Sequence, residues 1–234
     1  MALAGAGCAT LLAGGDALLE RTWAAARIFR PAGALAGPGG IPLVVYAHGC
    51  AGLDDDLRDW AELLTAHGYA VIAPDHRARG GRPPACDTSP VYRPGDIDTL
   101  VARDAELRYA LRQVRTLPWV RQPAVFLLGF DQGAVVAAAY TGPPFTGYII
   151  TGWTCTSPHP RGGLATALER PVLAIRWARD PRFADPAWNG DCGARLGGRP
   201  ASRSLILDGA GHSTAGDERA RRAVIDFLHA NTPR

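Results

Sequence analysis

A sharp turn from a strand into a helix constrains this chain more than any other part of its sequence. The strand-like run 125–128 breaks into Gly129–Gly133, which reads Gly-Phe-Asp-Gln-Gly, and the helix-prone run 134–139 follows at once. Glycines flank the central Asp131 because a strand and a helix joined this tightly leave no room for side chains. Asp131 is therefore the first candidate for a functional residue.

The composition is that of a globular protein and excludes several classes of function. With 234 residues, 47% of them hydrophobic, the chain is expected to form one domain, 1–234, with a sizeable core. The net charge of +3 comes from positive residues scattered singly, so we expect no nucleic-acid partner. All 25 basic residues are arginine, which excludes Schiff-base chemistry and a Walker-type phosphate loop. No run has the roughly 18 apolar residues of a membrane span.

Apolar runs of strand character alternate with helical patterns, which favours a mostly parallel sheet with helices on both faces. After a weak first segment at 23–30, strands are predicted at 41–47, 69–74, 125–128, 148–152, 172–177 and 205–207. Helices are predicted at 57–67, 97–117, 134–139 and 218–230 from apolar residues that recur at helical spacing. A loop rich in glycine, arginine and proline is expected up to residue 94.

Residues with catalytic chemistry follow four of the predicted strands. The segment His48–Gly52 follows the strand 41–47, Asp131 follows 125–128, Asp180 follows 172–177, and His212 follows 205–207. Active sites of parallel sheets form at the carboxyl ends of the strands. The order of nucleophile position, acid and histidine is that of the α/β-hydrolase triad.

With these motifs in order, the chain resembles α/β-hydrolases of the lidless, dienelactone-hydrolase-like type. The similarity runs from His48-Gly49-x-x-Gly52 through 68–75 to His212, which is nearly the whole chain. It implies an α/β-hydrolase fold with a mostly parallel central sheet and no cap domain, acting on a small-molecule substrate. No residues have metal-ligand spacing and no dinucleotide fingerprint follows the first strand, so we expect no metal and no cofactor.

The resemblance also implies a role for each matching residue. Asp131 stands at the nucleophile position, and His212 is the general base. Asp180 orients His212 through the far ring nitrogen, with Asp185 and Asp191 as rivals for that role. The backbone amides of Cys50 and Gln132 are the implied oxyanion hole.

Other histidines and tryptophans near the strand ends have weaker interpretations. His48 is expected to shape its loop rather than take part in chemistry. Trp153 and His159 are candidates to line the substrate pocket, although core packing explains Trp153 and its counterpart Trp177 equally well. Surface positions are predicted for His67, His76 and His229.

The aspartate at position 131 leaves three hypotheses open. In the first, the chain hydrolyses a small ester, lactone or related bond through Asp131, Asp180 and His212. In the second, it is a silenced hydrolase, either a natural binding module or an engineered replacement of serine. In the third, Asp131 attacks saturated carbon, as in haloalkane dehalogenases and epoxide hydrolases. The short segment 154–170, which leaves no room for a cap, and Gln132 after the nucleophile position count against the third.

The five cysteines bear on the compartment. We predict the pairs Cys50–Cys86 and Cys155–Cys192 on loops beside the site, which indicates a periplasmic or secreted protein. Free thiols in a cytoplasmic enzyme are the alternative. The N-terminal segment 1–8 lacks the basic region and the long apolar run of a signal peptide, so we expect no signal there.

Overall fold

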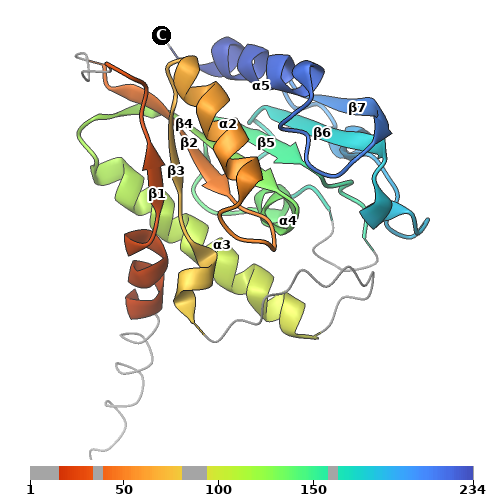
Figure 1. Cartoon of the computed structure of the whole chain (residues 1–234), viewed down its shortest axis with the longest axis horizontal. Helices are drawn as coiled ribbons and strands as arrows, with labels where there is room; N and C mark the ends of the chain where they lie inside the picture. Colours follow the sequence, from red (N-terminus) through yellow and green to blue (C-terminus); the bar gives the residue numbers. More distant parts are fainter. Residues whose placement is uncertain (1–15, 34–38, 81–93, 158–162, 234) are drawn as a thin grey trace, which may run out of the picture.

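The computed structural model of the chain describes residues 16–33, 39–80, 94–157 and 163–233. At its centre is a seven-stranded sheet in the order β1-β3-β2-β4-β5-β6-β7 (Figure 1). The strands are β1 Arg27–Phe29, β2 Ile41–Ala47, β3 Ala70–Ala73, β4 Val120–Phe130, β5 Tyr148–Thr151, β6 Val172–Arg179 and β7 Arg203–Ala210. The edge strand β1 runs antiparallel to β3, and the other neighbouring pairs are parallel. The predicted, mostly parallel sheet is confirmed.

Helices cover both faces of the sheet. The helices α2 (Asp55–Ala66) and α5 (Glu218–Asn231) pack on one face, and α3 (Pro94–Thr116) and α4 (Gln132–Ala139) pack on the other (Figure 1). Alternate residues of β2 therefore join different cores, with Val45 on the α3 side and Val44 on the α2 side. A strand covered on both faces needs apolar residues at nearly every position, which explains its continuous apolar run. In the described ranges no helix is both long and apolar enough to cross a bilayer.

The observed elements lie close to the predicted ones, with two clear differences. The strand β4 begins at Val120, five residues before the predicted start at 125. It therefore includes residues 121–123, which are two polar residues followed by a proline. Its pairing with β2 shifts register between Ile41 and Leu43, so this irregular start lacks the alternation by which a strand is recognised. The weak segment at 23–30 is the end of a helix at 16–24 followed by the three residues of β1.

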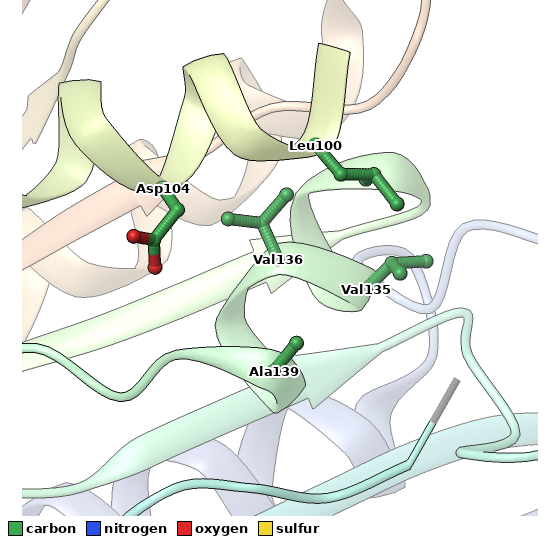
Figure 2. Close-up of a pocket in the computed structure, with 5 residues that line it drawn as sticks. All are labelled: Leu100, Asp104, Val135, Val136 and Ala139. Carbon is green, nitrogen blue, oxygen red and sulfur yellow. The ribbon is translucent and has the colours of Figure 1, made fainter. Parts of the chain in front are cut away.

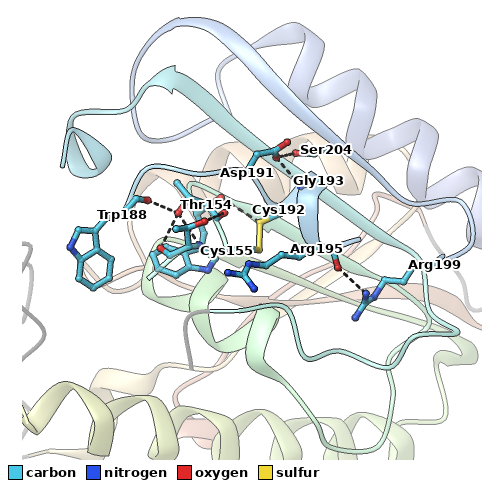
Figure 3. Close-up of a disulfide and its surroundings, with 11 residues drawn as sticks. Thr154, Cys155, Trp188, Asp191, Cys192, Gly193, Arg195, Arg199 and Ser204 are labelled. Atoms are coloured by element: carbon cyan, nitrogen blue, oxygen red, sulfur yellow. Dashed lines mark hydrogen bonds between the residues drawn. A yellow bond between two sulfur atoms is a disulfide. The ribbon is translucent and has the colours of Figure 1, made fainter. Parts of the chain in front are cut away.

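One of the two predicted disulfides lies within the described residues. Cys155, just after β5, is bonded to Cys192 at the start of the short helix η3, Cys192–Arg195, and confirms the prediction (Figure 3). A hydrogen bond beside the bridge joins the same two segments: the Thr154 hydroxyl donates to the backbone carbonyl of Trp188 at 2.7 Å. The other predicted pair, Cys50–Cys86, requires Cys86, which lies outside the described residues.

Candidate active site

The turn at 129–133 has the strained geometry of a nucleophile elbow. Asp131 directly follows β4 with φ of 54° and ψ of −120°, and α4 begins at the next residue. A positive φ is uncommon for a residue with a side chain, so the backbone of this turn is strained. A Cβ atom on Gly133 would overlap the carbonyl oxygen of Ala47, and one on Gly129 would overlap that of Gly133. The two glycines are thus required by the close approach of α4 to β4 and β2.

The three residues predicted for the triad lie together. Nδ1 of His212 is 2.7 Å from Oδ2 of Asp180, whose side chain is fully buried. Nε2 of His212 is 3.4 Å from Oδ1 of Asp131, an ion-pair distance outside the geometry of a hydrogen bond. The two other candidates for the acid bind backbone amides two residues ahead instead. Asp185 accepts from the Ala187 amide at 2.8 Å, and Asp191 accepts from the Gly193 amide at 2.9 Å.

The carboxylate of Asp131 accepts a hydrogen bond from one of the two backbone amides predicted for the oxyanion hole. The backbone N–H of Cys50 donates to Oδ2 of Asp131 at 2.8 Å. Arg182 approaches the other oxygen, with Nη1 3.3 Å from Oδ1. Gln132 opens α4, and its side-chain carbonyl accepts from Arg103 at 3.2 Å. Asp131 is therefore held between one backbone donor and two cationic side chains.

The charges of Asp131, Asp180, His212 and Arg182 shift the pKa values of Asp131 and His212. Burial acts to raise the pKa of Asp131, but His212 and then Arg182 outweigh it, and the pKa falls to about 2. Burial acts to lower the pKa of His212, but the carboxylates of Asp131 and Asp180 raise it to about 9. At neutral pH the resting site thus holds a carboxylate beside an imidazolium.

A second set of contacts holds the loop that carries His212. The indole N–H of Trp177 donates to the backbone carbonyl of Ser213 at 2.8 Å. The Ser213 hydroxyl donates to Oδ1 of Asp56, and the Tyr46 hydroxyl donates to Oδ2 of the same carboxylate at 2.6 Å. Burial, the largest influence, raises the pKa of Asp56 to about 6. Trp177 therefore positions the His212 loop and does not pack only as core.

Of the predicted pocket residues, Trp153 is placed in the core and His159 lies outside the described residues. The Trp153 ring is 4% exposed and packs edge-on against Phe183 and beside Trp188. A substrate-binding role for Trp153 therefore has no support from its contacts with these two rings.

Sequence reasoning missed several charged groups around the site. Arg182 follows Asp180 by two residues, and its backbone N–H also donates to Asp180 Oδ1 at 3.0 Å. His76, predicted to lie on the surface, is 1% exposed, and that prediction is wrong. It pairs with Glu106, which is itself buried, because the short helix η1, His76–Arg79, lies against the middle of α3. His67 and His229 are exposed as predicted.

A separate small hollow lies between α3 and α4 (Figure 2). It is lined by two residues of α3 and three of α4, namely Leu100, Asp104, Val135, Val136 and Ala139. None of these belongs to the groups around Asp131. Within the described residues no cluster of histidine, cysteine and acidic side chains is arranged to hold a metal ion.

Comparison with known proteins identifies the fold. No family model and no curated protein matches the chain. A dienelactone hydrolase-like promiscuous phosphotriesterase from metagenomic libraries is 19% identical with a TM-score of 0.67, over 89% of this chain and 92% of that one. A cold-adapted esterase from an Arctic intertidal metagenomic library is 16% identical with a TM-score of 0.62, over 89% and 88%. The dienelactone hydrolase from Anabaena variabilis is 18% identical with a TM-score of 0.56, over 89% and 92%. The chain has the α/β-hydrolase fold of these proteins.

Proposed function

We propose that the protein is a hydrolase of small esters, lactones or related bonds, and that Asp131 is its nucleophile. One observation carries the proposal: the two carboxylate oxygens of Asp131 have different partners. Oδ2 accepts the N–H of Cys50 at 2.8 Å, while Oδ1 lies 3.4 Å from Nε2 of His212. This arrangement separates an oxygen that attacks from an oxygen that carries negative charge later in the reaction.

In the first step Oδ1 of Asp131 attacks the electrophilic carbon of the substrate. A new carbon–oxygen bond forms to Asp131, and the bond to the leaving oxygen breaks. His212 gives its proton to the leaving alkoxide, which departs as an alcohol, or stays attached if the substrate is a lactone. Asp131 then has no charge, so the main support for the raised pKa of His212 is lost and its imidazole stays neutral.

In the second step neutral His212 removes a proton from water, and the hydroxide attacks Cγ of Asp131. The resulting oxyanion forms on Oδ2, where the N–H of Cys50 already points. The bond between Cγ and Oδ1 then breaks, so Oδ1 leaves in the product carboxylate, the water oxygen stays in Asp131, and one water has been consumed for each bond hydrolysed. The new Asp131 carboxyl releases its proton to solvent, and Asp131 and His212 return to their charged resting forms.

The structural neighbours support a hydrolase, since they are described as a dienelactone hydrolase and as an esterase. A small substrate fits the short segment between β5 and β6, residues 152–171, where related enzymes with a cap carry an extra domain. The disulfide Cys155–Cys192 supports an oxidising compartment, periplasmic or secreted. Mass spectrometry of protein purified under non-reducing conditions and alkylated at once tests that placement.

Isotope labelling tests the nucleophile. The enzyme is incubated with p-nitrophenyl acetate, a small lactone, a haloacid and an epoxide, in water enriched in oxygen-18. Attack of water on Cγ places the label in the carboxylate of Asp131, which peptide mass spectrometry detects after a single turnover. Asp131→Asn, which is nearly isosteric, should abolish turnover, and His212→Gln should accumulate the covalent adduct.

Three outcomes contradict the proposal. Label found only in the product, with turnover retained in Asp131→Asn, rules out Asp131 as the nucleophile. An inactive native chain that gains esterase activity as Asp131→Ser is a silenced esterase. Turnover of only the haloacid or the epoxide assigns attack at saturated carbon instead.

A further inference from the structure

The segment that bears the Cys50 N–H is held from behind by a buried histidine. His48 is 2% exposed and follows β2, two residues before Cys50. Its Nδ1 lies 2.6 Å from the carbonyl oxygen of Gly49, and its Nε2 accepts the backbone N–H of His76 at 3.1 Å. Both ring nitrogens of this histidine are therefore occupied by the backbone.

These two partners fix the protonation of the ring. A carbonyl oxygen only accepts, so Nδ1 of His48 must carry a hydrogen, which it donates to Gly49. The N–H of His76 only donates, so Nε2 of His48 must be without a hydrogen. Burial, with His76 and Arg103 nearby, lowers the pKa of His48 well below its usual value and keeps the ring neutral.

The bond to Gly49 bears directly on the amide of Cys50, because both belong to one peptide unit. In a trans peptide the carbonyl and the N–H point in opposite directions within one plane. Drawing the Gly49 carbonyl toward His48 therefore turns the Cys50 N–H away from His48 and toward Asp131. Gly49 also leaves room for this contact, since a Cβ atom there would lie only 3.0 Å from the Asp131 carboxylate.

A buried arginine fixes the preceding peptide and links it to the elbow. Arg103, on α3, is 2% exposed and donates through Nη2 to the backbone carbonyl of His48. Its Nη1 donates to the side chain of Gln132, the first residue of α4, at 3.2 Å. The loop after β2 and the start of α4 are thus tied to one guanidinium.

We propose that His48 is a positioning residue whose Nδ1–H, through the Gly49 carbonyl, aims the N–H of Cys50 at the oxygen that becomes the oxyanion. This role rests on the proposed function for its effect on catalysis, but the aim of the N–H is a property of the resting protein. The orientation of the Cys50 N–H is therefore measured by its amide resonance, and the effect on catalysis is measured separately by turnover.

Two variants of His48 separate the contacts of its two ring nitrogens. In His48→Asn the side-chain NH₂ takes the place of Nδ1–H and keeps the donor to Gly49 but loses the acceptor for His76. In His48→Leu both are lost. His67→Leu is the matched control, because Nδ1 of His67 also bonds a backbone carbonyl, that of Leu63 at 2.9 Å, far along α2 from the site.

The amide proton of Cys50 is followed by NMR in uniformly ¹⁵N-labelled protein near pH 7. In the native chain it should resonate downfield, as expected for an N–H bonded to a carboxylate. His48→Leu should move this resonance upfield while the spectrum stays dispersed, and His48→Asn and His67→Leu should leave it close to native. An unchanged Cys50 resonance in folded His48→Leu, or equal displacement in both His48 variants, overturns the proposal.

Turnover of the ester substrate gives the second readout. His48→Leu should lower kcat by about tenfold to a hundredfold with little change in KM, less than the hundredfold or more that loss of a whole oxyanion donor costs. His48→Asn should recover most of kcat. If the resonance moves but kcat does not, the proposed function fails at the oxyanion hole while the positioning by His48 stands.

Discussion

Replacing Asp131 with asparagine isolates the charge coupling at the centre of the site. The substitution keeps the shape of the side chain and removes one of the two carboxylates beside His212. The other, Asp180, remains 2.7 Å from Nδ1 of the ring. We expect the pKa of His212 to fall from about 9 in the native protein toward neutrality.

The size of this fall follows from the geometry. At the 3.4 Å between Nε2 of His212 and Oδ1 of Asp131, two unit charges interact by roughly 5 kcal/mol at an effective dielectric constant of about 20, and roughly 1 kcal/mol in water. These side chains are 16% and 12% exposed, so the interaction lies between the two values. Since one pH unit corresponds to about 1.4 kcal/mol, the pKa should fall by about 2.

The same coupling makes stability depend on pH. The folded-state pKa of His212 lies above the unfolded value of 6.5, so its contribution is complete below that pH and is lost as the pH rises through about 9. The loss amounts to roughly 3 kcal/mol in the native protein. In Asp131→Asn most of it should be absent, because His212 then titrates close to its unfolded value.

Histidine-selective NMR titration measures the pKa, and urea unfolding at pH 6 and pH 10 measures the stability. Asp185→Asn serves as the control, because its carboxylate caps the Ala187 amide and does not contact His212. The reasoning is refuted if Asp131→Asn leaves the pKa of His212 within about 0.5 of the native value, a change worth less than about 0.7 kcal/mol.

Three further predictions concern the frame around the site. The double variant Cys155→Ser, Cys192→Ser opens a bridge of sequence separation 37 and should lower the unfolding free energy by about 4 kcal/mol in urea; a loss below about 1 kcal/mol contradicts the chain-entropy argument. Gly133→Ala should cost more than about 3 kcal/mol or prevent folding, because its Cβ meets the backbone of β2, whereas Gly216→Ala, with open space around it, should stay within about 0.5 kcal/mol in thermal unfolding. The pKa of Asp56 is raised from 3.8 to about 6, so native stability should gain about 2 kcal/mol as the pH falls from 6 to 4; Asp56→Asn should abolish this gain, and an unchanged pH dependence would assign it elsewhere.

The apolar strands and the glycine elbow were readable from the sequence because their patterns have local causes. The run at 41–47 is apolar throughout because β2 is covered on both faces, and its predicted bounds are those observed. The spacing of Asp131, Asp180 and His212 was also readable, because each follows the end of a strand of one parallel sheet.

The buried charged residues could not be predicted in this way, because the sequence does not distinguish an arginine that is buried and paired from one that is solvated. Arg103 lies on the apolar stripe of α3, between Leu100 and Leu107, and this was the available signal that it points inward. His76 and Glu106 pair across elements 30 residues apart, which no local pattern records. Long-range pairing of polar groups is fixed by the fold, so sequence periodicity predicted the sheet and not the contacts beneath the site.

In the proposed mechanism, the aspartate at position 131 changes the order in which His212 gives and takes a proton. A serine at an elbow needs a neutral imidazole from the start, because its hydroxyl must lose a proton to attack. Asp131 is already ionised, with a pKa of about 2, and its charge holds His212 in the protonated form. The imidazolium can therefore act only as an acid until a covalent bond removes the charge of Asp131. In the proposed mechanism His212 becomes a base through the reaction itself, so the same two residues would serve attack and hydrolysis in turn.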